Sequence, residues 1–362
     1  MPKVSICLPT YNRAPELRNA LRAMHAQTFT DWELIVGDDA STDNTDDVVR
    51  EFDDPRIRYH RHASNAGIFG NWNKLVSLAS GEYVSIYHDH DIYLPTIVEA
   101  SCSILDKHPR VSVVHTASLL IDRKGVPIDV LVRDFDEVTP GRKFQETMAG
   151  TLGNPVIAAS AMVRRSAYEA TGPYDPEYGE AADKDMWLRL AGLGDVGYIR
   201  APQALFLARG KEDATARFEW KNVVGSIRIC EEWIDRLFAT GSAEHRKAKR
   251  KLSRMSDRAM LRLALKAIGL EDSQTAIERS RLLRRNSSLA TNAMIWTVVR
   301  IPTVRALVGR AALWTHLSSL NRRRRAAEDY CRNSPQVSLH LPVNRSGHSA
   351  RAGDGGHGHD GQ

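Results

Sequence analysis

Residues 3–38, KVSICLPTYNRAPELRNALRAMHAQTFTDWELIVGD, indicate the fold class. An apolar run at 3–9 suits a buried strand, and a second apolar run follows at 32–38. Between them, residues 14–27 carry apolar side chains at the three- and four-residue spacing of an amphipathic helix. A strand, a helix and a strand joined by short connections predict two parallel strands linked by a right-handed crossover.

The same alternation continues through the first third of the chain. Strand-like runs recur at 57–62, 82–88 and 111–121, and helix-like segments at 42–52, 70–80 and 95–108. The pattern is less regular from 122 to 215, apart from a helix at 182–193, and it becomes helical and basic from about 219. We therefore predict an α/β fold with a doubly wound, mostly parallel sheet, followed by a C-terminal helical region.

Composition limits the classes of protein to consider. The chain has 362 residues, of which 42% are hydrophobic and 26% charged, as in ordinary soluble globular proteins. Its 4 cysteines lie far apart without a C-x-x-C pair, which favours a reducing compartment. No signal peptide and no apolar run of about 20 residues is visible. We expect a cytoplasmic protein, with peripheral contact at the inner face of the cytoplasmic membrane as an option.

The net charge of +6 is concentrated in one region. Between residues 240 and 325, 20 Lys and Arg face 5 Asp and Glu. One interpretation is a solvated face on an accessory helical region, and the other is contact with an anionic membrane surface. Nucleic acid is not an expected partner, because the interleaved aromatic residues typical of single-strand binders are absent.

Polar clusters follow three of the predicted strands. They are Thr10 to Arg13, Asp38 to Asp43, and His88 to Asp91. A single polar loop of this kind is explained well by a turn. Because the carboxyl ends of strands in a doubly wound sheet lie at one edge, all three together predict a ligand site.

The sequence also indicates what kind of ligand to expect. Neither G-x-G-x-x-G nor G-x-x-x-x-G-K-[ST] is present, which disfavours dinucleotide-binding enzymes and P-loop NTPases. An anionic ligand that faces carboxylates needs a cation between them. Carboxylate oxygens suit Mg²⁺ or Mn²⁺, which bridge to phosphate oxygens.

Four runs of sequence resemble the family 2 glycosyltransferases, which have the GT-A nucleotide-sugar-binding fold. In chain order these are VSICLPTYNR (4–13), QTFTDWELIVGDDASTDNT (27–45), NAGIFGNWNKLVSLASGEYVSIYHDHDIYLP (65–95) and GPYDPEYGEAADKDMWLRLA (172–191). The resemblance covers residues 4 to about 193. It implies nothing about the chain beyond roughly residue 215.

The resemblance implies a set of nucleotide-binding residues. They are Pro9, Thr10, Tyr11 and Arg13 after the first strand, Asp39 after the second, Asn65, Gly67 and Asn73 in the third run, and Asp89. Asp39 is implied to accept a hydrogen bond from the base, and a carboxylate can read the imide N–H of uracil or thymine. For Asp38, capping of the following turn is an equal alternative, and for Asn65 and Gly67 the alternative is a tight turn.

The run HDHDIYLP (88–95) takes the position of the family's D-x-D metal motif. The resemblance implies Asp89 and Asp91 as ligands of Mn²⁺ or Mg²⁺. His90 stands where many relatives have a third carboxylate and is a third candidate ligand. In an alternative register of the motif, His88 stands in place of another carboxylate. Imidazole suits Zn²⁺ better than Mg²⁺, so the identity of the divalent cation stays open.

Sugar transfer with inversion needs a base that takes the proton of the acceptor hydroxyl. The family's base is the Asp of a Glu-Asp pair that opens a helix, and here that pair reads Ala182-Asp183. The resemblance thus implies Asp183. Helix capping and the helix dipole explain an Asp there as well, and Glu180 and Asp185 are nearby alternatives.

We therefore expect an inverting glycosyltransferase that uses a nucleotide-sugar donor, with a UDP- or dTDP-sugar favoured by Asp39. The resemblance implies an acceptor hydroxyl on a cell-surface glycan or a lipid-linked precursor. The alternative is a non-catalytic nucleotide-sugar-binding or scaffold protein with a degenerate metal motif. The expected divisions are a catalytic domain at 1–215, a basic helical region at 216–330 and a disordered tail at 331–362.

Overall fold

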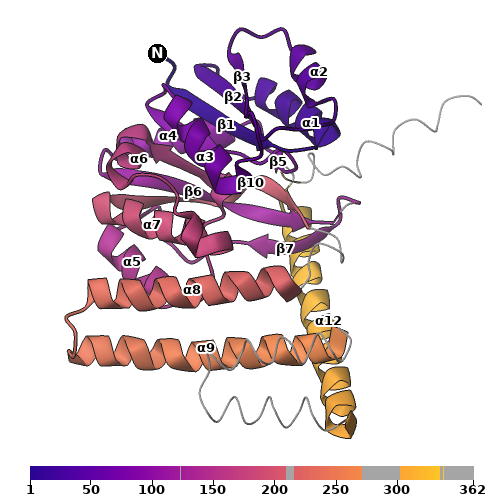
Figure 1. The fold of residues 1–362 in the computed structure, drawn as a ribbon, viewed down its shortest axis with the longest axis vertical. Coiled ribbons are helices and arrows are strands. Elements are labelled where there is room, and N and C mark those ends of the chain that lie inside the picture. Colours follow the sequence, from indigo (N-terminus) through magenta and orange to yellow (C-terminus); the bar gives the residue numbers. More distant parts are fainter. Residues whose placement is uncertain (123, 209–215, 271–301, 335–336, 338–362) are drawn as a thin grey trace, which may run out of the picture.

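A computed structural model describes residues 1–122, 124–208, 216–270, 302–334 and 337. Within these ranges one continuous mixed sheet is covered by helices on both faces (Figure 1). Its strand order is β3-β2-β1-β4-β9-β6-β10-β5, with β7 paired to β6 and β8 paired to β10. Separate clusters of buried apolar side chains fill the two faces. The predicted fold class is confirmed.

The first third of the chain alternates between strands and helices, except that β5 follows β4 without a helix between them. Its strands are β1 (Val4–Thr10), β2 (Trp32–Asp38), β3 (Ile57–Arg61), β4 (Tyr83–Ile86) and the short β5 (Ile92–Tyr93). Its helices are α1 (Ala14–His25), α2 (Thr45–Arg50), α3 (Gly67–Leu78) and α4 (Ile97–Lys107). The pairings β1–β2, β1–β4 and β2–β3 are parallel, as expected for strands joined by helical crossovers.

The segment of residues 111–207 adds long strands, several shorter strands and further helices. Its elements are β6 (Val111–Ile121), β7 (Pro127–Leu131), β8 (Val138–Thr139), α5 (Gly141–Ala149), η1 (Ala158–Ser160), β9 (Ala161–Arg164), α6 (Arg165–Thr171), η2 (Pro176–Ala181), α7 (Ala182–Leu193) and β10 (Asp195–Leu207). β6 and β10 pair in parallel, whereas β9 runs antiparallel between β4 and β6. The pairings β10–β5, β10–β8 and β6–β7 are antiparallel as well, so the sheet is mixed.

A close approach between α3 and β2 fixes one wall of the later site. A Cβ on Gly37 would lie 2.5 Å from Asn71 Oδ1 and 2.8 Å from two Leu75 methyl carbons. Asn71 uses this proximity, because its Nδ2 donates to the Gly37 carbonyl at 2.8 Å. Glycine at position 37 therefore lets α3 pack directly on the strand that ends at Asp38.

The helices α8 (Ala216–Leu237) and α9 (Ala243–Leu270) lie side by side below the sheet, and α12 (Pro302–Arg332) packs against α9 (Figure 1). α8 shares its core with α7: Cys230 and Ile234 belong to the same cluster of buried residues as Trp187. Further, Trp233 Nε1 donates to Asp185 at 3.0 Å. The first part of the predicted helical region is thus built into the packing of the α/β part.

The end of α12 packs on the edge of the sheet. Ala327, Cys331 and Val337 are buried against Leu119 and Leu205 of the long strands β6 and β10. Among the helices that the structure describes, none combines the length and apolarity needed to cross a bilayer. Most of the predicted tail 331–362, and residues 271–301 of the basic region, lie outside the described residues.

Candidate active site

The loops after β1 and β2 are held together by polar contacts at the carboxyl edge of the sheet. The Asn12 N–H donates to Ser41 Oγ at 2.9 Å, and Asn12 Oδ1 accepts from Thr42 N at 2.7 Å. Asn12 and Ala40 both have positive φ, at 51° and 64°, a conformation that non-glycine residues adopt mainly where their surroundings impose it. Specific hydrogen bonds therefore fix the two loops relative to each other.

Asp38 and Asp39 have different roles in this edge. Asp38 is completely buried, with Oδ1 accepting from Ser41 N at 2.8 Å and Oδ2 accepting from the Tyr59 hydroxyl at 2.6 Å. Asp38 caps the following turn, which is one of the two interpretations that the sequence left open. Asp39 lines the cavity described below, and its carboxylate oxygens accept from Ala66 N at 2.6 Å and Gly67 N at 3.0 Å. Asp39 thereby anchors the start of α3.

His88, His90 and Asp91 form a potential metal site in the described part of the chain. One ligand atom from each lies within 4.8 Å of the others. His88 Nδ1 is 3.1 Å from Asp91 Oδ2, and the two imidazoles stack with ring centroids 5.3 Å apart. The Trp72 ring also stacks on His88, with ring centroids 5.7 Å apart, and helps to hold that imidazole in place.

Asp89 faces the β1 loop and is not part of this group of three. Its Oδ2 accepts from Thr10 Oγ1 at 2.8 Å, and its Oδ1 lies 3.3 Å from Arg13 Nη1 and 2.9 Å from His90 Nδ1. Burial alone would raise the pKa of Asp89, but the contacts with His90, Arg13 and Thr10 hold that pKa below its usual value. Asp89 is therefore a carboxylate fixed in its ionised form.

Asp183 lies in the first turn of α7. Its Oδ2 accepts from Asn154 Nδ2 at 2.8 Å, and its Oδ1 accepts from Lys184 N at 2.7 Å. Burial raises the pKa of Asp183 to about 7, although both hydrogen bonds and the charge of Lys184 favour the ionised form. A carboxyl group with this pKa can both hold and release a proton near neutral pH.

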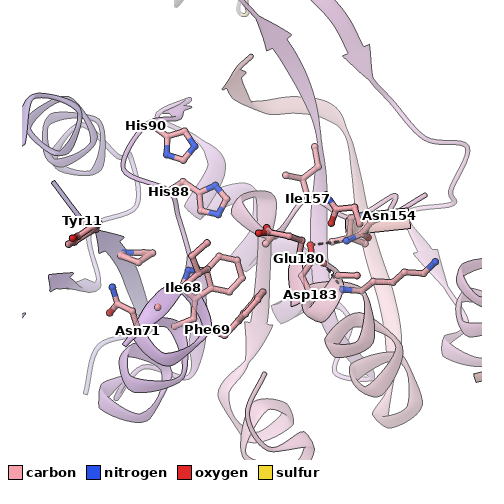
Figure 2. Close-up of a pocket in the computed structure, with 18 of the residues that line it drawn as sticks. Tyr11, Ile68, Phe69, Asn71, His88, His90, Asn154, Ile157, Glu180 and Asp183 are labelled. Carbon is pink, nitrogen blue, oxygen red and sulfur yellow. Dashed lines mark hydrogen bonds between the residues drawn. The ribbon is translucent and has the colours of Figure 1, made fainter. Parts of the chain in front are cut away.

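A cavity of about 670 Å³ joins these groups. Figure 2 shows His88 and His90 on one side of it, and Asn154, Glu180 and Asp183 on the other. Much of the remaining wall is apolar and comes from α3 and the loop before β9, including Phe69 and Ile157. Helix α8 also contributes to the wall. The site thus combines elements from both halves of the described chain.

Most of the predicted site residues meet in this cavity. Those that line it are Pro9, Thr10, Tyr11, Arg13, Asp39, Asn65, Gly67, Asp89, His90 and Asp183. Asn73 is not brought to it, because its amide exchanges two hydrogen bonds, of 3.0 and 2.8 Å, with the backbone of Tyr174. Asp91 lies behind His88 and also accepts from Leu207 N at 3.3 Å.

The sequence analysis missed several residues of the cavity. His88 was named only for an alternative register of the metal motif and not as a site residue. Asn154 lies in an irregular Gly/Pro-containing break, which gave no indication of its partner Asp183. Asn222, Val223 and Ser226 of α8 line the cavity from a region with no recognised motif.

Comparison with known proteins identifies the family. The model of the family "Glycosyl transferase family 2" matches residues 5–172. The putative glycosyltransferase EpsE of Bacillus subtilis is 30% identical over 221 residues, which are 60% of this chain and 76% of that protein. The chain belongs to glycosyl transferase family 2. It is therefore a glycosyltransferase of the class that uses nucleotide sugars.

Two further likenesses place this family 2 glycosyltransferase among its relatives. An enzyme of Campylobacter jejuni named GalNAc(5)-diNAcBac-PP-undecaprenol beta-1,3-glucosyltransferase is 42% identical over 94 residues, which are 25% of this chain and 30% of that enzyme. The crystal structure of S. aureus TarS 1-349 in complex with UDP-GlcNAc matches with a TM-score of 0.57 and 18% identity, covering 91% of this chain and 92% of that one. The latter likeness shows the fold alone.

Proposed function

We propose that this family 2 glycosyltransferase transfers a sugar with inversion from a nucleotide-sugar donor to an acceptor hydroxyl, with Asp183 as the general base. The observation that carries the proposal is a single cavity in which the polar edge of the sheet faces Asp183. Inversion requires the acceptor to attack from the side opposite the leaving group. A base and a phosphate-binding edge on opposite sides of one cavity fit that requirement.

Asp183 would remove the proton of the acceptor hydroxyl as its oxygen bonds to the anomeric carbon. The bond from that carbon to the diphosphate oxygen breaks at the same time, so the configuration inverts and a nucleoside diphosphate leaves. A base with a pKa of about 7 is well matched to this step at neutral pH. Asn154 and Lys184 N hold both carboxylate oxygens in place before the reaction.

His88, His90 and Asp91 would hold a divalent cation. The two imidazoles and one carboxylate fit a transition metal such as Mn²⁺ or Zn²⁺ better than Mg²⁺, which prefers oxygen ligands. Such a cation would neutralise the charge that develops on the departing diphosphate. If Nδ1 of His88 carries the proton and donates to Asp91, its Nε2 is free to act as a ligand.

The donor is proposed to be a UDP- or dTDP-sugar. Asp39 lines the cavity, and an ionised carboxylate has about four acceptor positions, of which the backbone of Ala66 and Gly67 uses two. The others can accept the imide N–H of uracil or thymine. The UDP-GlcNAc in the TarS structure supports a uridine donor on the same fold.

A panel of nucleotide sugars tests the proposal directly. We expect a UDP- or dTDP-sugar, and not a GDP-sugar, to raise the melting temperature, and to do so more in the presence of Mn²⁺ than of EDTA. The selected donor should then release nucleoside diphosphate when glycan or polyprenyl-diphosphate acceptors are added. Stabilisation without any release across the acceptor panel would favour the non-catalytic, nucleotide-sugar-binding alternative.

The acceptor is proposed to be a lipid-linked or cell-surface glycan, reached at an anionic membrane through α9. Among the exposed cations of this helix, four lie at spacings of seven, four and four residues. They are Lys247, Arg254, Arg258 and Arg262. Leu252, Met260 and Leu263 are buried on the other side of the helix. The undecaprenol in the name of the Campylobacter relative supports a lipid-linked acceptor.

Replacing these four α9 cations by glutamine should weaken binding to phosphatidylglycerol vesicles by at least about tenfold, since each cation near an anionic surface contributes about 1 kcal/mol. Co-sedimentation at low and high salt measures this. A matched control replaces four exposed cations elsewhere. These are Arg22, Arg110, Lys124 and Lys143. Equal losses in both variants, or equal binding to neutral vesicles, would contradict a role for α9.

A further inference from the structure

Asn154 presents its amide to Asp183 in a fixed orientation. Its Oδ1 accepts from Val156 N at 3.2 Å, within its own loop. The nitrogen of the amide must therefore point the other way, where Nδ2 donates to Asp183 Oδ2 at 2.8 Å (Figure 2). Because rotating the amide by 180° would break both contacts, the side chain is a committed donor to the carboxylate.

Lys184 fixes the loop that carries Asn154. Its side chain is completely buried, and Nζ donates to the Thr151 carbonyl at 2.6 Å and to Cys230 Sγ at 3.2 Å. The backbone N–H of the same residue donates to Asp183 Oδ1. One lysine thus ties the Asn154 loop, helix α8 and the carboxylate into a single unit.

We propose that Asn154 is a positioning residue for the base: it orients the carboxylate of Asp183 towards the cavity and favours its ionised form. This inference rests on the proposed function, in which Asp183 removes the acceptor proton. The Asn154 N–H interacts with the ionised carboxylate much more favourably than with the neutral acid. Without the Asn154 donor, the carboxylate would lose one of the hydrogen bonds that offset the effect of burial, and Asp183 would ionise less readily.

The charged and titratable groups around Asp183 determine how far its ionisation can shift. Lys184 of α7 is the neighbouring cation, and burial lowers the pKa of its amine. Glu180 of η2 is a second carboxyl group that lines the same cavity. Burial raises the pKa of the Tyr174 hydroxyl and of the Cys230 thiol on α8, which keeps both neutral. Asn154 is therefore the side-chain donor that offsets burial at Oδ2.

The inference can be tested without any substrate, through the pH dependence of stability. A carboxyl group whose pKa is raised by folding binds a proton more tightly in the folded state, so unfolding becomes easier as pH rises from about 4 to about 7. The difference in unfolding free energy between the parent and Asp183→Asn changes over this pH range. It stops changing at the folded-state pKa of Asp183, which we call the end point. Urea titrations between pH 4 and 9 locate that end point.

Asn154→Ala should move this end point upward by about one pH unit, the size expected for one hydrogen bond to a charged group. Asn154→Asp, which keeps the shape of the side chain, should move it further, because a second carboxylate replaces the donor. In the Asp183→Asn background, Asn154→Ala should change the free energy of unfolding by an amount that does not vary with pH. An unchanged end point in both Asn154 variants would overturn the inference.

Gly153→Ala is the matched control in the same loop. A Cβ there would meet Thr151 Oγ1 at 3.8 Å, an ordinary contact, and would leave the Asn154 amide untouched. Its end point should equal that of the parent. This comparison separates loss of the donor from general disturbance of the loop.

Turnover then distinguishes the inference from the proposed function. With the donor selected by the panel, Asn154→Ala should release nucleoside diphosphate about tenfold more slowly than the parent at pH 6 and recover most of that loss at pH 9. If the stability end point moves but the acid limb of the rate profile does not, Asp183 is not the base, and the catalytic role of Asn154 fails with it. If neither moves, only the Asn154 contact is wrong.

Discussion

Replacing Asp183 by asparagine is expected to lower the rate of sugar transfer by about 10²–10⁴-fold, the usual contribution of a positioned general base. The amide keeps the shape of the side chain but cannot take a proton. Binding of the donor should change little, because the loops proposed to bind the nucleotide lie on the other side of the cavity. Release of nucleoside diphosphate and donor affinity, measured on the same samples, check both parts.

The parent rate should also follow the ionisation of this group. Because burial raises the pKa of Asp183 to about 7, kcat/KM should rise about tenfold per pH unit below pH 7 and level off above it. The Asp183→Asn variant should lose this acid limb. A parent profile that levels off already at pH 5 would contradict an elevated pKa at the base.

Asp185 provides a matched control two residues along the same helix. Asp185 is buried, accepts from Arg189 Nε at 2.8 Å and Trp233 Nε1 at 3.0 Å, and does not line the cavity. Asp185→Asn should therefore reduce the free energy of unfolding by about 1–3 kcal/mol while the folded enzyme keeps its turnover. Glu180→Gln is the competing test, since Glu180 does line the cavity. If that variant loses turnover and Asp183→Asn does not, Glu180 is the base.

Length alone did not decide how much of the fold could be predicted, because the 13-residue strand β10 was missed as well as the short β9. The first third could be predicted because runs such as 3–9 and 32–38 are apolar and separated by an amphipathic helix. β9 was not readable, because four residues are too few to show a period and its antiparallel place between β4 and β6 depends on contacts distant in sequence. Local pattern therefore predicted the parallel part of the sheet better than the inserted strand.

The candidate site shows the same limit. Residues at strand ends, such as Thr10, Asp39 and Asp89, could be placed because topology alone brings the ends of neighbouring strands together. The contact between Asn154 and Asp183 joins a loop and a helix 29 positions apart, and no local signal links them. The contribution of α8 to the cavity could not be predicted either, since its packing against α7 follows from tertiary contacts.

Replacing both imidazoles of the metal group, as His88→Ala with His90→Ala, is expected to weaken Mn²⁺ binding by at least about 100-fold. Two of the three potential ligands are then missing, and even indirect support of a metal ligand is worth 10- to 100-fold. Calorimetric titration with Mn²⁺ in the absence of donor measures the loss. Transfer should fall with it, because the leaving diphosphate would no longer be neutralised.

His60→Ala is the control for loss of an imidazole. His60 belongs to β3, and its ring packs on His62 at 5.1 Å, outside the group of His88, His90 and Asp91. Its Mn²⁺ affinity should equal that of the parent. If the double variant also binds Mn²⁺ like the parent, the cation is held elsewhere and the assignment of this group is wrong.

A third variant, His90→Asp, tests which metal the site prefers. The change gives three consecutive carboxylates at 89–91 and replaces a nitrogen ligand by oxygen, so affinity should shift from Zn²⁺ towards Mg²⁺. The ratio of the two dissociation constants is the measurement, because it cancels any general loss of order near Arg13 and Asp89. A ratio that stays constant would mean that His90 contacts Arg13 and Asp89 but not the cation.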